Sequence, residues 1–258
     1  MTLDLGPLLD PASSALAAAF LVFLRIGAAL ALLPAFGEMI VPVRVRLMAA
    51  LAFTAIAFPA VEARVGAAVA DGAHLAFLAG GEVVAGLMLG VSLRLLVVAL
   101  HVASSIAAQA TSLSQLLGGA SVDPQPALGL ILLWGALALA ASMGLHVRFA
   151  AMFIQSYDMI GPGVLPSGSQ AAGWLVPAVA RTFEFAFLAA MPFVAASLIY
   201  NLTLGVINKA MPQLMVAFVG APAITFGALV LLWLSAPVIL SLWVGALEAV
   251  AQNPFGAR

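Results

Sequence analysis

Few side chains in this sequence could take part in chemistry, and most of the ionised ones stand inside long apolar runs. The most regular set recurs at every fourth residue: Glu82, Gly86, Gly90 and Arg94. On a helix this spacing places both charges and both glycines on one stripe. Gly86 and Gly90 form a GxxxG pair, which lets two helix backbones approach closely. Unpaired buried charges are costly, so we expect Glu82 and Arg94 each to find a partner across a helix interface.

Arg25 is an isolated charge near the middle of the first apolar segment. A central arginine costs about 2.5–3.5 kcal/mol on membrane insertion scales, so its position requires a structural or functional explanation. One interpretation is an inward-facing group beside a transport pathway. The other, which we prefer, is an interhelical ion pair or a side chain that reaches out to the membrane interface.

Motifs for catalysis are absent from the sequence. It contains no HExxH, no GxxxxGK[ST], no GxSxG and no cysteine, and its 10 acidic residues are scattered. We therefore predict a protein that is not an enzyme, with no bound cofactor and no metal site. The energy for any transport would have to come from another component.

The composition sets the fold class. Hydrophobic residues make up 65% and charged residues 7% of 258 residues, with a mean hydropathy of +1.20. Soluble domains average about 45–50% apolar and about 25% charged residues. The apolar runs are continuous rather than alternating, which excludes a β-barrel. We predict an all-α integral membrane protein with several membrane passes, and the net charge of −1 without a basic block predicts no nucleic-acid partner.

The predicted architecture is one membrane domain over residues 1–258, with about six apolar segments in hairpins broken by proline and glycine. The expected helices are 12–33, 43–62, 75–100, 127–146, 174–200 and 214–235, with a possible extra helix at 238–251. The second apolar run, Leu47–Val61, would cover only about 22 Å, which is less than a bilayer core. This short run is a first indication that the protein does not sit in lipid as a conventional transporter does.

One polar joint separates two uncharged arms at residues 185–208 and 210–247. Pro212 has no amide hydrogen and disfavours helical geometry at Met211, so the chain should form a hairpin or a broken helix there. The joint is rich in amide side chains, glycine and proline, and it holds the only ionised group of the region. Its defining residues are Asn201, Gly205, Asn208, Lys209, Pro212, Gln213, Gly220 and Pro222.

Residues 201–222 resemble the C-terminal signature of the FliR family, the flagellar biosynthetic export-gate subunits, in the pattern N-L-x-L-G-x-I-N-[KR]-x-x-P-Q-x-x-x-F-x-V-G-x-P. The P-x-F-G and P-x-R-x-R patterns within 34–46, and the stripe at 82–94, are similar to the same family. The resemblance implies a structural and gating subunit of the flagellar type III protein-export channel in the bacterial inner membrane. It also implies assembly with FliP-like and FliQ-like subunits, with FlhB-like and FlhA-like proteins nearby, and passage of unfolded flagellar subunits.

The stretch 109–125 is rich in glycine and serine but holds no charge before Asp123. Irregular backbone at membrane depth is tolerated only inside protein or beside a cavity, which favours a buried loop. The family resemblance implies that this loop helps to plug the closed pore, through Leu113, Leu116 and Leu117. The alternative is an ordinary connecting loop.

Two other functions fit the sequence less well. A subunit of virulence-type (type III) secretion would share the fold and the mechanism but carry other cargo. A small-solute secondary transporter would suit Arg25, Glu82 and Arg94 together with proline-broken helices. We see no internal repeat of the kind that many such transporters have.

Overall fold

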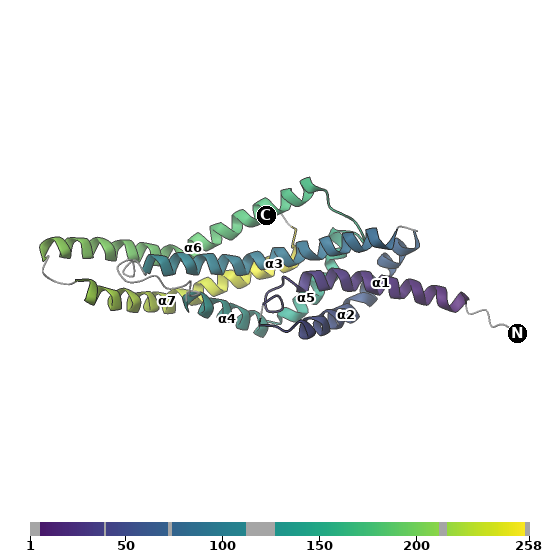
Figure 1. Ribbon diagram of the computed structural model, residues 1–258, viewed down its shortest axis with the longest axis horizontal. Coiled ribbons are helices and arrows are strands. Elements are labelled where there is room, and N and C mark those ends of the chain that lie inside the picture. Colours follow the sequence, from purple (N-terminus) through teal and green to yellow (C-terminus); the bar gives the residue numbers. More distant parts are fainter. Residues whose placement is uncertain (1–5, 39, 72–73, 112–126, 212–215, 256–258) are drawn as a thin grey trace. The chain divides into compact units, whose positions relative to one another are not determined.

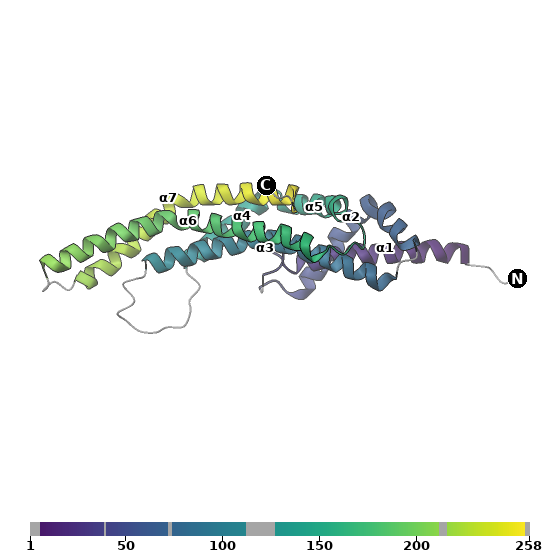
Figure 2. The same cartoon turned by 90° about the horizontal axis from the view of Figure 1, so that it is seen from above.

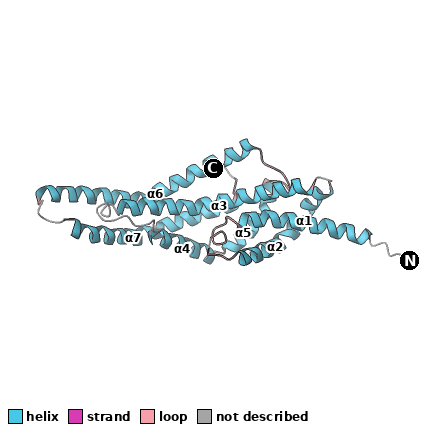
Figure 3. Ribbon diagram, viewed as in Figure 1, coloured by secondary structure: helices cyan, strands magenta, loops and turns pink. Residues whose placement is uncertain are grey.

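The structure is a computed structural model that describes residues 6–38, 40–71, 74–111, 127–211 and 216–255. Every regular element in these ranges is a helix, as Figure 3 shows. The helices are α1 (Gly6–Leu30), α2 (Val43–Ala70), α3 (Leu75–Thr111), α4 (Ala127–Ser142), α5 (Leu145–Met159), α6 (Gly168–Ala210) and α7 (Val216–Gln252). The all-α fold class predicted from the uncharged apolar runs is confirmed.

Five of these helices are long and apolar enough to cross a membrane, namely α1, α2, α3, α6 and α7. A sixth candidate is the pair α4 and α5, which is bent by 76° at a short break. The predicted number of about six apolar segments agrees with this result.

The chain divides into two compact units. The first contains residues 1–95, 141–178 and 247–258, and the second contains residues 96–140 and 179–246. The boundaries fall inside α3, α4, α6 and α7, and Figure 1 shows these helices as continuous ribbons.

In the first unit, α2 packs against α1 and α5. Phe53 of α2 is central to this packing, because its ring makes edge-to-face contacts with Phe36 and Phe153 at centroid distances of 6.1 and 5.5 Å. Such aromatic pairs contribute roughly 0.5–1.5 kcal/mol beyond the area that they bury.

In the second unit, α6 and α7 run as the antiparallel arms of a hairpin beside the end of α3 (Figures 1 and 2). Two side chains tie these arms to α3. The indole nitrogen of Trp243 on α7 donates to the carbonyl of Leu96 at 2.9 Å, and the hydroxyl of Ser197 on α6 donates to the carbonyl of Ala110.

Two helices at the beginning of the chain are longer than expected. The first helix already begins at Gly6 rather than near residue 12, and α2 continues to Ala70 rather than ending near residue 62. At 28 residues, α2 is about 42 Å long, so the short apolar run does not limit it. Beyond the apolar run, Arg64 of α2 pairs with Asp158 of α5 at 2.5 Å.

The segment expected at 127–146 is divided. Helix α4 ends at Ser142, and α5 begins at Leu145. Gly144 lies between them with φ +79°, a left-handed conformation that only glycine adopts at little cost. This residue explains why the two helices bend instead of continuing.

The last two helices are also longer than expected. Helix α6 begins at Gly168, where Ser167 and Gln170 form a reciprocal capping box, and it runs on through the first half of the joint to Ala210. It ends directly before Met211 and Pro212, as the proline predicts. Residues 238–251 are not a separate helix, because α7 is continuous through Pro237. Proline is tolerated inside apolar helices of this type when neighbouring groups satisfy the freed carbonyl.

Candidate functional site

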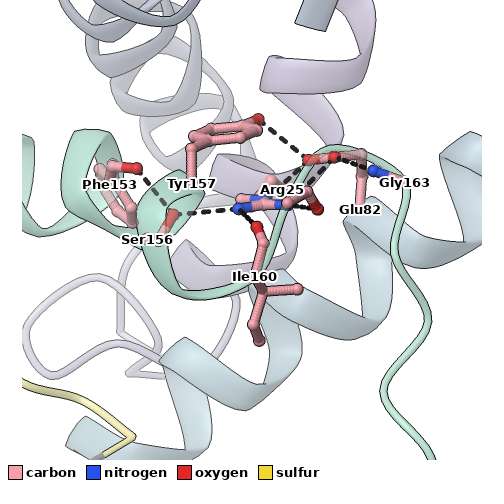
Figure 4. Close-up of polar contacts among 8 residues, drawn as sticks. Arg25, Glu82, Phe153, Ser156, Tyr157, Ile160 and Gly163 are labelled. Atoms are coloured by element: carbon pink, nitrogen blue, oxygen red, sulfur yellow. Dashed lines mark hydrogen bonds and ion pairs between the residues drawn. The ribbon is translucent and has the colours of Figure 1, made fainter. Parts of the chain in front are cut away.

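A buried ion pair between Arg25 of α1 and Glu82 of α3 is the centre of the first unit (Figure 4). Both side chains are fully buried. The Nε and one terminal nitrogen of Arg25 donate to the two oxygens of Glu82 at 2.6 and 3.1 Å. This is the bidentate arrangement in which arginine and carboxylate bind most strongly.

The other donors of Arg25 are also used. They reach the hydroxyl of Ser156 at 3.2 Å and the backbone carbonyls of Ile160 and Gly161 at 3.0 and 3.2 Å. A guanidinium has five N–H donors, so these bonds and the two to Glu82 use its full donor capacity. The guanidinium carbon also lies 3.7 Å from the centre of the Tyr157 ring, in a cation–π contact.

Glu82 is equally well satisfied. Besides Arg25, its oxygens accept from the hydroxyl of Tyr157 at 2.9 Å and from the backbone N–H of Gly163 at 2.8 Å. Each carboxylate oxygen therefore accepts two hydrogen bonds, so the cost of removing the charge from water is offset on both sides of the pair. We name Arg25, Glu82, Ser156, Tyr157 and Gly163 the buried ion-pair cluster.

Small residues bring the three elements of the cluster together. A Cβ atom at Gly86 would overlap the carbonyl oxygen of Arg25, and one at Gly90 would lie 2.7 Å from the carbonyl oxygen of Ala29. Both glycines of the GxxxG pair thus face α1 of the same chain. Gly81 is similarly close to the backbone of Gly163, which holds the chain after α5 against α3.

The cluster is suited to holding structure rather than to reacting. Its charges cancel, and the described contacts occupy the acceptor sites of Glu82, which leaves this carboxylate no lone pair for a general base. Among the described residues there is no group of three His, Cys, Asp or Glu side chains that could hold a metal ion. A largely apolar cavity of about 270 Å³ lies beside the cluster, between Met88, Ile160, Gly161 and Trp174.

The other predicted charge of the stripe, Arg94, has a different partner. It pairs with Glu38 at 2.6 Å, and both side chains are part-buried. Arg46 reaches the same turn but donates to backbone rather than to a carboxylate, at 2.9 Å to the carbonyl of Phe36 and 3.3 Å to that of Glu38. The backbone of the 34–42 turn supplies those acceptors because it leaves carbonyls outside any helix.

The remaining predicted site residues lie elsewhere. Leu113, Leu116 and Leu117 are outside the described residues, and so are Pro212 and Gln213 of the joint. Gly220 and Pro222 lie in the first turns of α7. At the end of α6, Asn201 donates to Ser197 at 3.1 Å, whereas Gly205, Asn208 and Lys209 are exposed. The 201–222 joint thus belongs to the second unit, whereas the cluster belongs to the first.

Sequence reasoning missed three members of the cluster: Ser156, Tyr157 and Gly163. Serine and tyrosine near the end of an amphipathic helix carry no signal of their own. The sequence indicated these residues only indirectly, through Arg25. A buried arginine needs a carboxylate and further hydrogen-bond acceptors. The glycine-rich run Gly161-Pro162-Gly163 offered the acceptors, but it has the composition of an ordinary loop.

Comparison with known proteins shows to which family the chain belongs. The sequence model of the bacterial export proteins, family 1, matches residues 16–250. The chain belongs to this family. It is also 32% identical over 227 residues to the flagellar biosynthetic protein FliR of Caulobacter vibrioides, covering 87% of this chain and 90% of the relative. The chain is thus a membrane-embedded export protein of the flagellar type, and the buried cluster lies within the part that the bacterial export family shares.

Proposed function

We propose that this protein is a structural and gating subunit of the flagellar type III protein-export channel of the bacterial inner membrane. The observation that carries the proposal is the match to the FliR relative over 87% of the chain. In this role residues 1–258 act as one membrane domain without catalytic activity. Unfolded flagellar subunits are the cargo.

The way the helices are buried supports a role as a subunit. The chain itself buries only 22% of the apolar window in α7 and 28% of those in α2 and α6. Large apolar side chains stay exposed along α6, among them Phe187, Met191, Leu198 and Val206. Neighbouring export-gate subunits of the FliP-like and FliQ-like kinds, with FlhB-like and FlhA-like proteins nearby, would cover such faces.

The proposal gives the predicted residues separate parts. The stripe Glu82, Gly86, Gly90 and Arg94 fixes α3 in place for assembly. The 201–222 joint forms the far end of the hairpin, and the loop with Leu113, Leu116 and Leu117 closes the pore. Replacing these three leucines by alanine is expected to raise the ion permeability of membranes that hold the assembled complex, and unchanged permeability would remove the plug from the proposal.

The transporter alternative has no support from the site. Its motivation was the group Arg25, Glu82 and Arg94, and each of these now has a partner inside the chain. The three charges therefore require no substrate to neutralise them.

The test is an affinity pull-down of the tagged chain from native membranes in mild detergent, followed by mass spectrometry. FliP-like and FliQ-like flagellar subunits in the eluate would support the proposal. Subunits of a virulence secretion system would keep the mechanism and change the cargo. A well-folded chain that elutes alone, in a strain where its deletion leaves flagellar export intact, would overturn the proposal.

A further inference from the structure

The turn after α1 holds a residue in a strained backbone conformation. Among the residues that the structure describes, Ala35 is the one non-glycine residue with a positive φ, at +70°. It directly follows Pro34, and where the residue after proline in a turn has a positive φ, glycine is the usual residue. An alanine in this conformation is disfavoured by roughly 5- to 30-fold, because its Cβ atom crowds the carbonyl oxygen that follows. Such strain persists only where the surrounding structure holds it.

The chain closes tightly around Ala35. The N–H of Gly37 donates to the carbonyl of Leu33 at 2.6 Å. A Cβ atom at Gly37 would lie only 2.8 to 2.9 Å from backbone atoms of residues 31–33, so this glycine rests directly on the chain that leaves α1. A change of φ at Ala35 redirects the chain that follows, so relaxation of Ala35 would break the hydrogen bond of Gly37. We name residues 31–38 the strained turn.

Side chains of two further helices hold the strained turn. From α2, Arg46 donates to the carbonyls of Phe36 and Glu38 at 2.9 and 3.3 Å. The ring of Phe53, also on α2, meets the ring of Phe36 edge to face. From α3, Arg94 donates to the carboxylate of Glu38 at 2.6 Å. The contacts from α2 come from the helix that the turn leads into, whereas Arg94 makes the strained turn depend on the position of α3.

The two ion pairs of the 82–94 stripe differ in how easily they can separate. Arg25 and Glu82 are fully buried, and leaving either of them unpaired is costly. Arg94 and Glu38 are 34% and 19% exposed, so water can replace part of their contact when they separate. One end of the stripe is therefore a fixed point between α1 and α3, whereas the other end can release.

We propose that the strained turn is a latch: Arg94 holds it closed, and when α3 moves Arg94 away from Glu38, Ala35 relaxes and the turn opens. Glycine at position 35 would adopt the same φ at little cost, so the alanine favours opening where a glycine would not. The inference rests on the proposed function and deepens it, because it assigns the opening to a step of protein export.

Hydrogen exchange of the full chain in lipid nanodiscs tests the latch without any export assay. The readout is the exchange rate of the Gly37 amide, which reports local opening of the turn. Arg94→Met keeps the length of the side chain but removes its donors, so it should raise this rate at least about fivefold. Ala35→Gly should lower the rate roughly 5- to 30-fold, because it removes the strain. Combining the two changes should bring the rate back toward that of the unchanged protein.

Two matched variants control for other causes. Ala31→Gly adds a glycine to the same turn at a residue whose φ is not positive, so it should not slow the exchange of Gly37. Asp158→Asn removes the ion pair between α2 and α5, which does not involve the strained turn, and it should not speed this exchange. An Ala35→Gly chain that exchanges as fast as the unchanged protein would overturn the inference, and so would an Arg94→Met chain that does not exchange faster.

The second measurement is the rate of flagellar subunit export per assembled complex, in a strain that depends on this chain. Because Ala35→Gly stabilises the closed turn, it should leave the amount of complex unchanged but slow export at least about fivefold. Ala31→Gly should export at the normal rate. Normal export from the Ala35→Gly chain, or loss of its complex, would overturn the latch even where hydrogen exchange is slower.

The two proposals fail in different ways. If deletion of the chain leaves flagellar export intact, the proposed function fails, whatever the exchange rates show. If export needs the chain but Ala35→Gly exports normally, only the inference on the strained turn fails.

Discussion

Gly86 of α3 lies so close to the backbone of Arg25 on α1 that a Cβ atom would overlap the carbonyl oxygen of Arg25. The residue that carries the buried guanidinium is thus also a point of very close approach between the two helices. Packing and charge are coupled here, because any shift of α1 away from Gly86 also moves Arg25 relative to Glu82.

The first prediction follows from this contact. Gly86→Ala should destabilise the chain by about 1–3 kcal/mol, because the overlap is with backbone and cannot be relieved by turning a side chain. The measurement is the thermal midpoint of the purified chain in detergent. Gly86→Leu and Gly90→Leu should abolish assembly and motility, and a normal complex with normal motility from both leucine variants would refute this.

Gly80→Ala on the same helix is the control for the first prediction. A Cβ atom at Gly80 would meet nothing within 4 Å, so this variant should be neutral or should stabilise the helix by about 0.5–1 kcal/mol. Equal losses of stability for Gly80→Ala and Gly86→Ala would show that the close approach of Gly86 to the backbone of Arg25 does not determine the effect.

The second prediction concerns the buried ion pair. Arg25→Leu or Glu82→Gln alone should destabilise the chain by about 3–5 kcal/mol, because each leaves an uncompensated buried charge. The double variant Arg25→Leu with Glu82→Gln should lose less than the sum of the two single losses. A double-mutant cycle measured by denaturation in detergent checks this, and additive losses would mean that the two charges do not interact.

The class of the fold could be predicted from the sequence, because an uncharged apolar run as long as 210–247 is typical of helices that cross a membrane. The Arg25–Glu82 pair was also within reach, as two opposite charges in apolar helices. The rest of the cluster was not. Its acceptors are the backbone carbonyls of Ile160 and Gly161, which every residue type carries, and they come from a loop about 135 residues further along the chain.

The break between α4 and α5 shows a different limit. Gly144 marks it, but a glycine inside an apolar run has no single meaning until its φ angle is known. The charges of α2 show a third limit. The 18-residue spacing of Arg46 and Arg64 is visible in the sequence, but their partners are not, because these come from the 34–42 turn and from Asp158 of α5.

The third prediction compares two ion pairs that differ in exposure. Arg64 and Asp158 are 45% and 60% exposed, whereas Arg94 and Glu38 are 34% and 19% exposed. Asp158→Asn should cost about 0–1 kcal/mol and lose its effect at high salt, because exposed pairs are screened. Glu38→Gln should cost more and respond less to salt. The thermal midpoint of both variants at low and high salt measures the difference. A larger loss of stability for Asp158→Asn than for Glu38→Gln would contradict the expectation drawn from burial.

The fourth prediction compares two glycines with positive φ. Gly144 and Gly163 have φ values of +79° and +67°, but only Gly163 is crowded, since its Cβ atom would overlap the side chain of Leu78. Gly144→Ala should therefore cost only the left-handed backbone, about 1–2 kcal/mol. Gly163→Ala should cost more, because the same strain is joined by the clash and by displacement of the N–H that Glu82 accepts at 2.8 Å.

Combining Gly163→Ala with a smaller neighbour, Leu78→Ala, separates these causes. If the clash dominates, the double variant should be more stable than the sum of the two single losses predicts. If the lost hydrogen bond to Glu82 dominates, removing the Leu78 side chain restores nothing, and Gly163→Ala should instead show non-additivity with Glu82→Gln. Equal losses for Gly144→Ala and Gly163→Ala would mean that the loop after α5 is held by backbone conformation alone, and that the cluster does not anchor it.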